Sequence, residues 1–155
     1  MTDQIKSGQS SQSGIPIGCF GWLADRAACG TYRVTSPLKH LARKHNVQVE
    51  AGANSIHPYT ILIAQRTHGE DQVDFLEQVK ANRQSVNGVE VPKIVYELDD
   101  DFWSIERDNP GYEYYTQPGL LDRAKDAIVL ADMVTVSTIA LEEIVSQWNE
   151  NVVVL

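Results

Sequence analysis

The chain has 155 residues, of which 43% are hydrophobic and 22% charged, and its formal net charge is −8. This length suits one domain with an ordinary hydrophobic core. The negative charge argues against a broad surface for nucleic acid or anionic membrane, although it leaves room for a local basic patch. The two cysteines, Cys19 and Cys29, are too few for a disulfide framework, so we expect reduced thiols in a cytoplasmic protein.

Residues 1–14 are rich in Ser, Gln and Gly, and apart from Met1 they contain one large apolar residue, Ile5. This composition predicts a disordered tail. Residues 15–155 are expected to form a single domain. Within the chain, no apolar stretch approaches the roughly 20 residues that a membrane helix needs, and the amino terminus lacks the apolar segment of a signal peptide. We therefore expect no membrane span.

The domain is expected to begin with a strand over residues 15–22, followed by a glycine-containing loop. Ser36 followed by Pro37 indicates a helix that begins there, with Ser36 as its N-cap. Apolar residues then share one face of this helix, cations occupy its last turn, and Asn46 is a plausible C-cap. The cations are Arg43, Lys44 and His45.

Short strands are predicted at residues 47–49 and 60–65, and the nearly unbroken apolar character of the second suits a strand covered on both faces. Residues 70–82 predict a helix that is acidic in its first turns and has the cations Lys80 and Arg83 at its end. Asn87-Gly88 is typical of a turn. The next apolar run, residues 93–98, predicts a fourth strand.

The rest of the chain repeats the alternation of strand and helix. A polar and aromatic loop over residues 104–119 precedes a helix marked by apolar residues at helical spacing. Residues 133–137 predict a strand, Ser137 or Thr138 then caps a further helix, and residues 152–155 predict the last strand. This order favours right-handed βαβ units, and therefore an α/β, Rossmann-like three-layer domain with a mainly parallel sheet of about six strands.

Polar residues follow the predicted strands at the ends where open α/β sheets bind ligands. Asp99, Asp100 and Asp101 come directly after the fourth strand, and three consecutive carboxylates favour a binding site over a simple turn. Arg66, just after the third strand, suits bidentate binding of a phosphate or carboxylate. His68 lies close by and is either a base, a hydrogen-bond donor or a solvated loop residue.

Several familiar site motifs fit poorly. The early glycines lack the Gly-x-Gly-x-x-Gly spacing of a dinucleotide-binding turn, and no Walker-type lysine loop is present. Asp99 and Asp101 match the paired aspartates of haloacid dehalogenase-type phosphatases, but Trp103 replaces a small residue and the motif comes late. A metal-binding Asp-x-Asp motif, as found in one glycosyltransferase fold, would suit Mg²⁺ or Mn²⁺. The repeating βα order of this chain is wrong for that fold. A receiver domain would need an isolated acceptor aspartate and a strand-end lysine.

Four segments, taken in order, resemble the amino-terminal half of GT-B-fold glycosyltransferases, particularly the family 4-like enzymes of bacteria and phages. The resemblance spans roughly residues 15–155. The segments are Cys29-Gly30-Thr31-Tyr32-Arg33, Ala64-Gln65-Arg66, Tyr96-Glu97-Leu98-Asp99-Asp100-Asp101-Phe102-Trp103 and Asp132-Met133-Val134-Thr135-Val136-Ser137-Thr138.

The resemblance implies an acceptor-side domain. Residues of the first segment would line the cleft near the donor phosphates and the acceptor, and we interpret that segment as a loop that is either a binding loop or a plain connection. Residues after the third and fourth strands would hydrogen-bond acceptor hydroxyls, and aromatic residues would offer flat faces to a sugar ring. The implied binding residues are Gly30, Tyr32, Arg33, Gln65, Arg66, Asp99, Asp100, Asp101 and Trp103, with Tyr112, Tyr114 and Tyr115 as further aromatic candidates.

The same resemblance implies a nucleotide-sugar as co-substrate, no metal and no other cofactor. The acceptor would be a glycan, a protein or modified DNA. Since the donor-binding half is not in this chain, we expect it to act with a carboxy-terminal donor-binding domain, in cis or in trans, and to be inactive alone. The alternative is a non-catalytic Rossmann-like binding or interaction module.

Overall fold

The computed structural model describes residues 18–24, 28–45, 47–52 and 58–155. The predicted tail, the first three residues of the predicted first strand and the predicted C-cap Asn46 lie outside the described residues. None of the described helices is long and apolar enough to cross a membrane.

A six-stranded, wholly parallel sheet organises the domain, in the order β2-β1-β3-β6-β7-β8. The predicted fold class, an α/β Rossmann-like domain with about six parallel strands, is therefore confirmed. The strands are β1 (Gly18–Trp22), β2 (Gln48–Gly52), β3 (Ile61–Gln65), β6 (Lys93–Leu98), β7 (Met133–Val136) and β8 (Val152–Val154).

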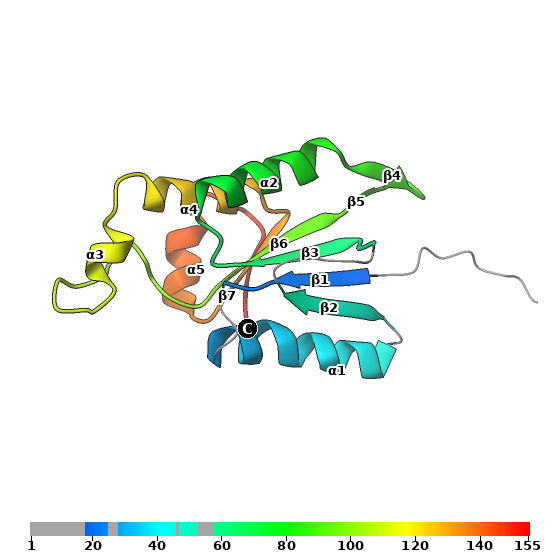
Figure 1. Ribbon diagram of the computed structural model, residues 1–155, viewed down its shortest axis with the longest axis horizontal. Helices are drawn as coiled ribbons and strands as arrows, with labels where there is room; N and C mark the ends of the chain where they lie inside the picture. The colour runs from blue at the N-terminus through cyan, green and yellow to red at the C-terminus, as the bar shows by residue number, and fades with distance from the viewer. Residues whose placement is uncertain (1–17, 25–27, 46, 53–57) are drawn as a thin grey trace, which may run out of the picture.

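Helices cover both faces of this sheet, which gives the domain three layers. Figure 1 shows α1 (Ser36–His45) along one face and α2 (Glu70–Ala81) with α4 (Leu120–Leu130) along the other. The helix α5 (Ile139–Val145) buries its apolar side chains in the same core as α2 and α4. A smaller core, built around Val34 and Leu38, lies on the other face of the sheet, under α1.

Strand β6 shows how the sequence divides side chains between the two faces. Ile94, Tyr96 and Leu98 are fully buried in the larger core, because alternate side chains of a strand point to the same face. Glu97 therefore points to the opposite face, which is the face that α1 partly covers. Strand β6, which leads into the predicted acidic residues, thus also carries the buried carboxylate of Glu97.

The segment that we predicted as a loop, residues 29–33, is helical. Cys29 is α-helical, and residues 30–33 belong to a π-helix, η1 (Gly30–Thr35), that runs directly into α1. Ser36 is therefore not an N-cap: its φ and ψ of −69° and −45° are helical, and its N–H donates to the carbonyl of Thr31. A proline inside a helix clashes with the preceding turn, and the wider π turn gives Pro37 more room there.

Two small elements were not predicted. A hairpin of β4 (Gln84–Val86) and β5 (Val89–Val91) closes through Asn87 and Gly88, whose φ angles of 53° and 79° both lie in the left-handed region. A short helix, α3 (Tyr112–Tyr115), interrupts the predicted aromatic loop. Figure 1 shows α3 beyond the carboxyl ends of the strands and the hairpin at the opposite end of the sheet.

The strand order fixes where a ligand is expected. From β1 the chain crosses to β2 on one side, whereas from β3 it proceeds to β6 on the other side. The switch point, where the direction of these connections along the sheet reverses, therefore lies between β1 and β3. In open α/β sheets, ligands bind in the crevice outside the carboxyl ends of the strands at such a point.

Candidate functional site

Charged and polar side chains from distant parts of the chain meet at the carboxyl ends of β3 and β6. We call this cluster the carboxyl rim; it consists of Arg33, Gln65, Arg66, Glu97, Asp99 and Asp100. Arg66 Nε lies 3.5 Å from Asp99 Oδ1, and Arg66 Nη1 lies 3.5 Å from Asp100 Oδ2. Arg66 and the first two aspartates of the acidic run thus meet, as the strand-end argument predicted.

The backbone of Arg66 is unusual. Its φ of 46° lies in the left-handed region, which costs energy for a residue with a side chain. Its N–H also donates to the carbonyl of Glu97 at 2.9 Å, which extends the pairing of β3 with β6 by one bond. Strained backbone of this kind is concentrated at ligand sites, and here it turns the chain just where the arginine meets the aspartates.

A second ion pair joins η1 to the sheet. Arg33 Nε lies 2.6 Å from Glu97 Oε1, and the Glu97 side chain is 2% exposed. Burial raises the pKa of Glu97, and the hydrogen bond and positive charge of Arg33 partly offset that effect. Arg33 Nη1 also donates to the carbonyl of Leu155 at 3.4 Å. The arginine therefore reaches over the sheet from η1 toward its last strand.

A row of buried polar residues crosses three neighbouring strands. Gln65, Glu97 and Thr135 are register partners on β3, β6 and β7, and they are 1%, 2% and 8% exposed. We call them the polar row. Strands of a parallel sheet covered on both faces are usually continuous apolar runs. Sequence reasoning did not single out Glu97 or Thr135, although a polar residue that interrupts a buried apolar strand was the available signal.

Part of the polar row has unused hydrogen-bonding capacity. Gln65 Oε1 accepts a bond from the N–H of Ala24 at 3.3 Å, next to the end of β1. Gln65 Nε2, Glu97 Oε2 and Arg33 Nη2 are all buried and, within the described part of the chain, have no hydrogen-bond partner. An interaction with the Gln65 side chain also lowers the pKa of Glu97, so the two side chains lie close together. Buried polar atoms without partners are rare in proteins and call for an explanation.

A hollow of about 220 Å³ opens after the carboxyl ends of β6 and β7. One wall is formed by the three consecutive aspartates, and the other by the start of α5, with Ser137, Thr138, Ala140, Leu141 and Ile144. Ser137 Oγ donates to the carbonyl of Asp99 at 2.8 Å, which ties β7 to the acidic segment. Burial raises the pKa of Asp100, and the neighbouring charge of Asp99 raises it further.

The third aspartate and the tryptophan have other roles. Asp101 Oδ1 accepts hydrogen bonds from the N–H groups of Trp103 and Ser104, at 2.9 and 3.1 Å, so it stabilises the turn after β6. Asp101 still lines the hollow. The ring of Trp103 packs at 4.8 Å from that of Trp148 and against the larger core. The structure shows packing for Trp103, and its contact with a sugar stays a prediction.

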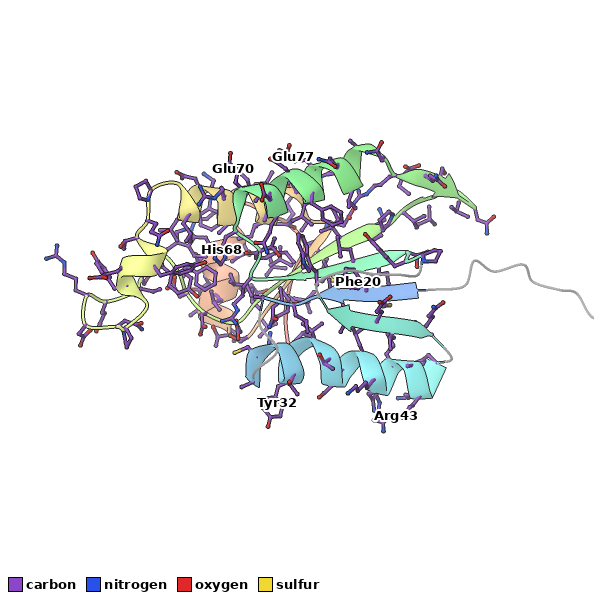
Figure 2. The ribbon with its side chains drawn as sticks, in the orientation of Figure 1. Phe20, Tyr32, Arg43, His68, Glu70 and Glu77 are labelled. Carbon is purple, nitrogen blue, oxygen red and sulfur yellow. The ribbon has the colours of Figure 1, made fainter. Side chains whose placement is uncertain are left out.

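The structure separates Tyr32 and Gly30, which were predicted to line the cleft together with Arg33, from that arginine. Tyr32 is 75% exposed, and Figure 2 shows it pointing away from the sheet on the outer side of the helix. Gly30 is buried within η1. Because residues 30–35 form a π-helix, consecutive side chains point in different directions, and only Arg33 of the three is shown at the rim. Our placement of Tyr32 beside Arg33 in the cleft was wrong.

Aromatic side chains from the predicted loop lie beside the rim. His68 Nε2 lies 2.8 Å from the hydroxyl of Tyr114, and burial lowers the pKa of His68. Tyr115 stacks on Phe102 with ring centroids 4.5 Å apart. Burial raises the pKa of Tyr115, Arg66 opposes that shift, and Asp100 adds to it. Because His68 follows Arg66 closely in the chain, its contact with Tyr114 brings α3 next to the carboxyl rim.

Within the described residues, no three His, Cys, Asp or Glu side chains are grouped so that they could hold a metal ion. No protein family, curated protein or solved structure matched this chain. Function therefore has to be argued from the residues of the site.

Proposed function

We propose that this chain is the acceptor-binding half of a GT-B-type glycosyltransferase that uses a nucleotide-sugar donor. The observation that supports this proposal best is the pair of buried residues, Gln65 and Glu97, which have unused hydrogen-bonding capacity on β3 and β6, next to the switch point between β1 and β3. The ion-paired cluster of Arg66, Asp99 and Asp100 lies directly beside them.

The chemistry of the rim suits a ligand with several hydroxyl groups. Each hydroxyl both donates and accepts hydrogen bonds, so it can satisfy carboxylate oxygens and amide or guanidinium N–H groups together. Ionised carboxylates accept such bonds strongly. The hollow next to Asp99 and Asp100 also has an apolar side formed by Ala140, Leu141 and Ile144, against which the apolar face of a sugar ring can pack.

In this proposal the chain holds the acceptor, and a second domain holds the donor. Catalysis would then come from positioning the acceptor hydroxyl and from neutralising the charge of the departing nucleotide diphosphate. The chain alone would bind sugars without turnover. The alternative, a non-catalytic binding module, also predicts sugar binding, but no transfer when a donor-binding domain is supplied.

Saturation-transfer NMR on the 155-residue chain tests the acceptor-binding proposal. The probes are a panel of neutral mono- and disaccharides at millimolar concentration. We expect at least one saccharide to bind, and its signal to fall strongly in a D99N/D100N double variant. The control is D108N, which removes the charge of an exposed carboxylate in the loop after β6.

Absence of binding by every saccharide would overturn the proposal. Equal binding by the double variant and the wild type would also overturn it, because the sugar would then lie elsewhere. Thermal unfolding of each variant shows whether the fold is kept.

A further inference from the structure

The carboxyl rim has an excess of negative charge. Arg33 is already paired with Glu97 at 2.6 Å, so that pair is close to neutral. Arg66 lies near both Asp99 and Asp100, and the hollow next to them also includes Asp101. Arg66 therefore pairs with two carboxylates while a third lines the adjacent hollow, so an incoming anion would meet a net negative charge.

We infer that this site selects an uncharged sugar ring with neighbouring hydroxyl groups and rejects phosphorylated and carboxylated sugars. The inference rests on the proposed function, and it adds the chemical class of the acceptor. Its basis is the polar row, where the hydrogen-bonding atoms without partners belong to side chains that are 1% and 2% exposed.

The two strands present complementary groups to such a ring. Gln65 and Glu97 are register partners on β3 and β6, so their backbones lie about 4.8 Å apart. Gln65 Nε2 can only donate and an ionised Glu97 Oε2 can only accept. Two adjacent hydroxyls can satisfy both atoms, one by accepting and the other by donating. Arg33 Nη2 offers a further donor on the same side.

A phosphate or carboxylate does not match this arrangement. Its ionised oxygens accept hydrogen bonds, so they would leave Glu97 Oε2 without a donor and bring a second negative charge next to it. Arg33 cannot compensate fully, since its Nε is already committed to Glu97. Burial makes both the unsatisfied Glu97 Oε2 and the added negative charge costly, because an unpaired charge in a desolvated site is unfavourable.

Calorimetric titration of the full chain with three probes of the same ring tests the inference. The probes are methyl α-D-glucopyranoside, glucose 6-phosphate and glucuronate. We expect the neutral glycoside to bind at least roughly tenfold more tightly than either anion, which corresponds to about 1.4 kcal/mol. This comparison needs no variant, so it does not depend on how a substitution affects folding.

The variant E97Q then tests the role of the buried carboxylate. We expect it to narrow the difference in affinity between neutral and anionic probes several-fold, because it adds a donor and leaves the positive charge of Arg33 uncompensated. The matched control is E77Q, which makes the same change on the outer side of α2 (Figure 2) and should leave the difference unchanged. Thermal unfolding shows that both variants are folded under the conditions of the titration.

The outcomes separate the two proposals. If neutral and anionic sugars bind equally well, or the anions bind better, the inferred selectivity is wrong while acceptor binding stands. If E97Q keeps the full discrimination of the wild type, Glu97 is not its source and the inference also fails. If no sugar of any charge binds, here or in the wider saccharide panel, the proposed function fails and the inference fails with it.

Discussion

Arg33 Nε lies 2.6 Å from Glu97 Oε1, although 64 positions separate the two residues in the chain. The contact ties η1 to the middle of the sheet and covers a buried carboxylate. We predict that R33M, which keeps much of the side-chain volume, destabilises the protein by about 2–3 kcal/mol, because it leaves Glu97 buried without its cation. Urea unfolding at neutral pH measures this loss.

The same variant should show a distinctive pH dependence. Burial already raises the pKa of Glu97, and without Arg33 the pKa should rise further. A carboxyl whose pKa is raised by folding stabilises the folded state at low pH and loses that contribution as pH rises through the folded pKa. The R33M defect should therefore be larger near pH 8 than near pH 5. A defect that is equal at both pH values would mean that lost packing, rather than the unpaired charge, is responsible.

Asp132 is a structural carboxylate at the opposite end of the sheet. It accepts bonds from the N–H of Ile94 at 2.8 Å, from Arg83 and from Lys93 at 3.3 Å. Burial alone would raise the pKa of Asp132, but these partners outweigh it and lower the pKa. Its contribution is therefore present above the unfolded pKa and is lost as pH falls through the folded pKa.

We predict that D132N costs about 2 kcal/mol near neutral pH. The variant should also flatten the loss of stability below about pH 5, since the titrating group is gone. Denaturant unfolding of both proteins across this range checks the expectation. If the free energy of unfolding fell equally with pH in the wild type and in D132N, the stabilising role of the Asp132 carboxylate would be contradicted.

Gly21 permits the close approach of η1 and α1 to β1. A Cβ at this position would lie 2.5 Å from Val34 Cγ1 and 3.0 Å from Leu38 Cδ1. We predict that G21A destabilises the protein by about 1–3 kcal/mol through overpacking. The matched control is G52A on β2, where a Cβ would have no heavy atom of the described residues within 4 Å. Similar melting temperatures for the two variants would refute this account.

Thr138 caps α5 through a bond from the N–H of Leu141 to its Oγ1 at 3.2 Å. T138A should therefore cost about 1 kcal/mol, whereas T138S should keep most of the cap. Thermal unfolding of the two variants measures the difference. If both lose equal stability, the hydroxyl is not what stabilises the start of this helix.

Much of the fold was predictable because its elements follow local rules. The apolar strands at residues 60–65 and 93–98, and the Thr138 cap, all appear at their predicted places. The prediction that a helix begins with Ser36 as its N-cap was wrong, since Pro37 is also compatible with a position in α1 directly after a wide π turn. The hairpin strands are three residues long, too short to show a pattern.

The site was predictable only where it follows strand ends. Arg66 and Asp99 each come directly after a strand, so their meeting followed from a parallel sheet. The Gln65–Glu97 pair depends on strand register, which residue order alone does not give. Tyr32 was misplaced because the direction of its side chain depends on a helix that was interpreted as a loop.

The central claim is that the carboxyl rim binds a sugar. The most direct measurement is a titration of the ¹⁵N-labelled chain with methyl α-D-glucopyranoside, followed by its backbone amide chemical shifts. The account predicts saturable shifts at Gln65, Arg66, Glu97 and Asp99, and little change in the hairpin of residues 84–91. Shifts confined to the hairpin or to the outer face of α1, or no saturable shift at all, would contradict it.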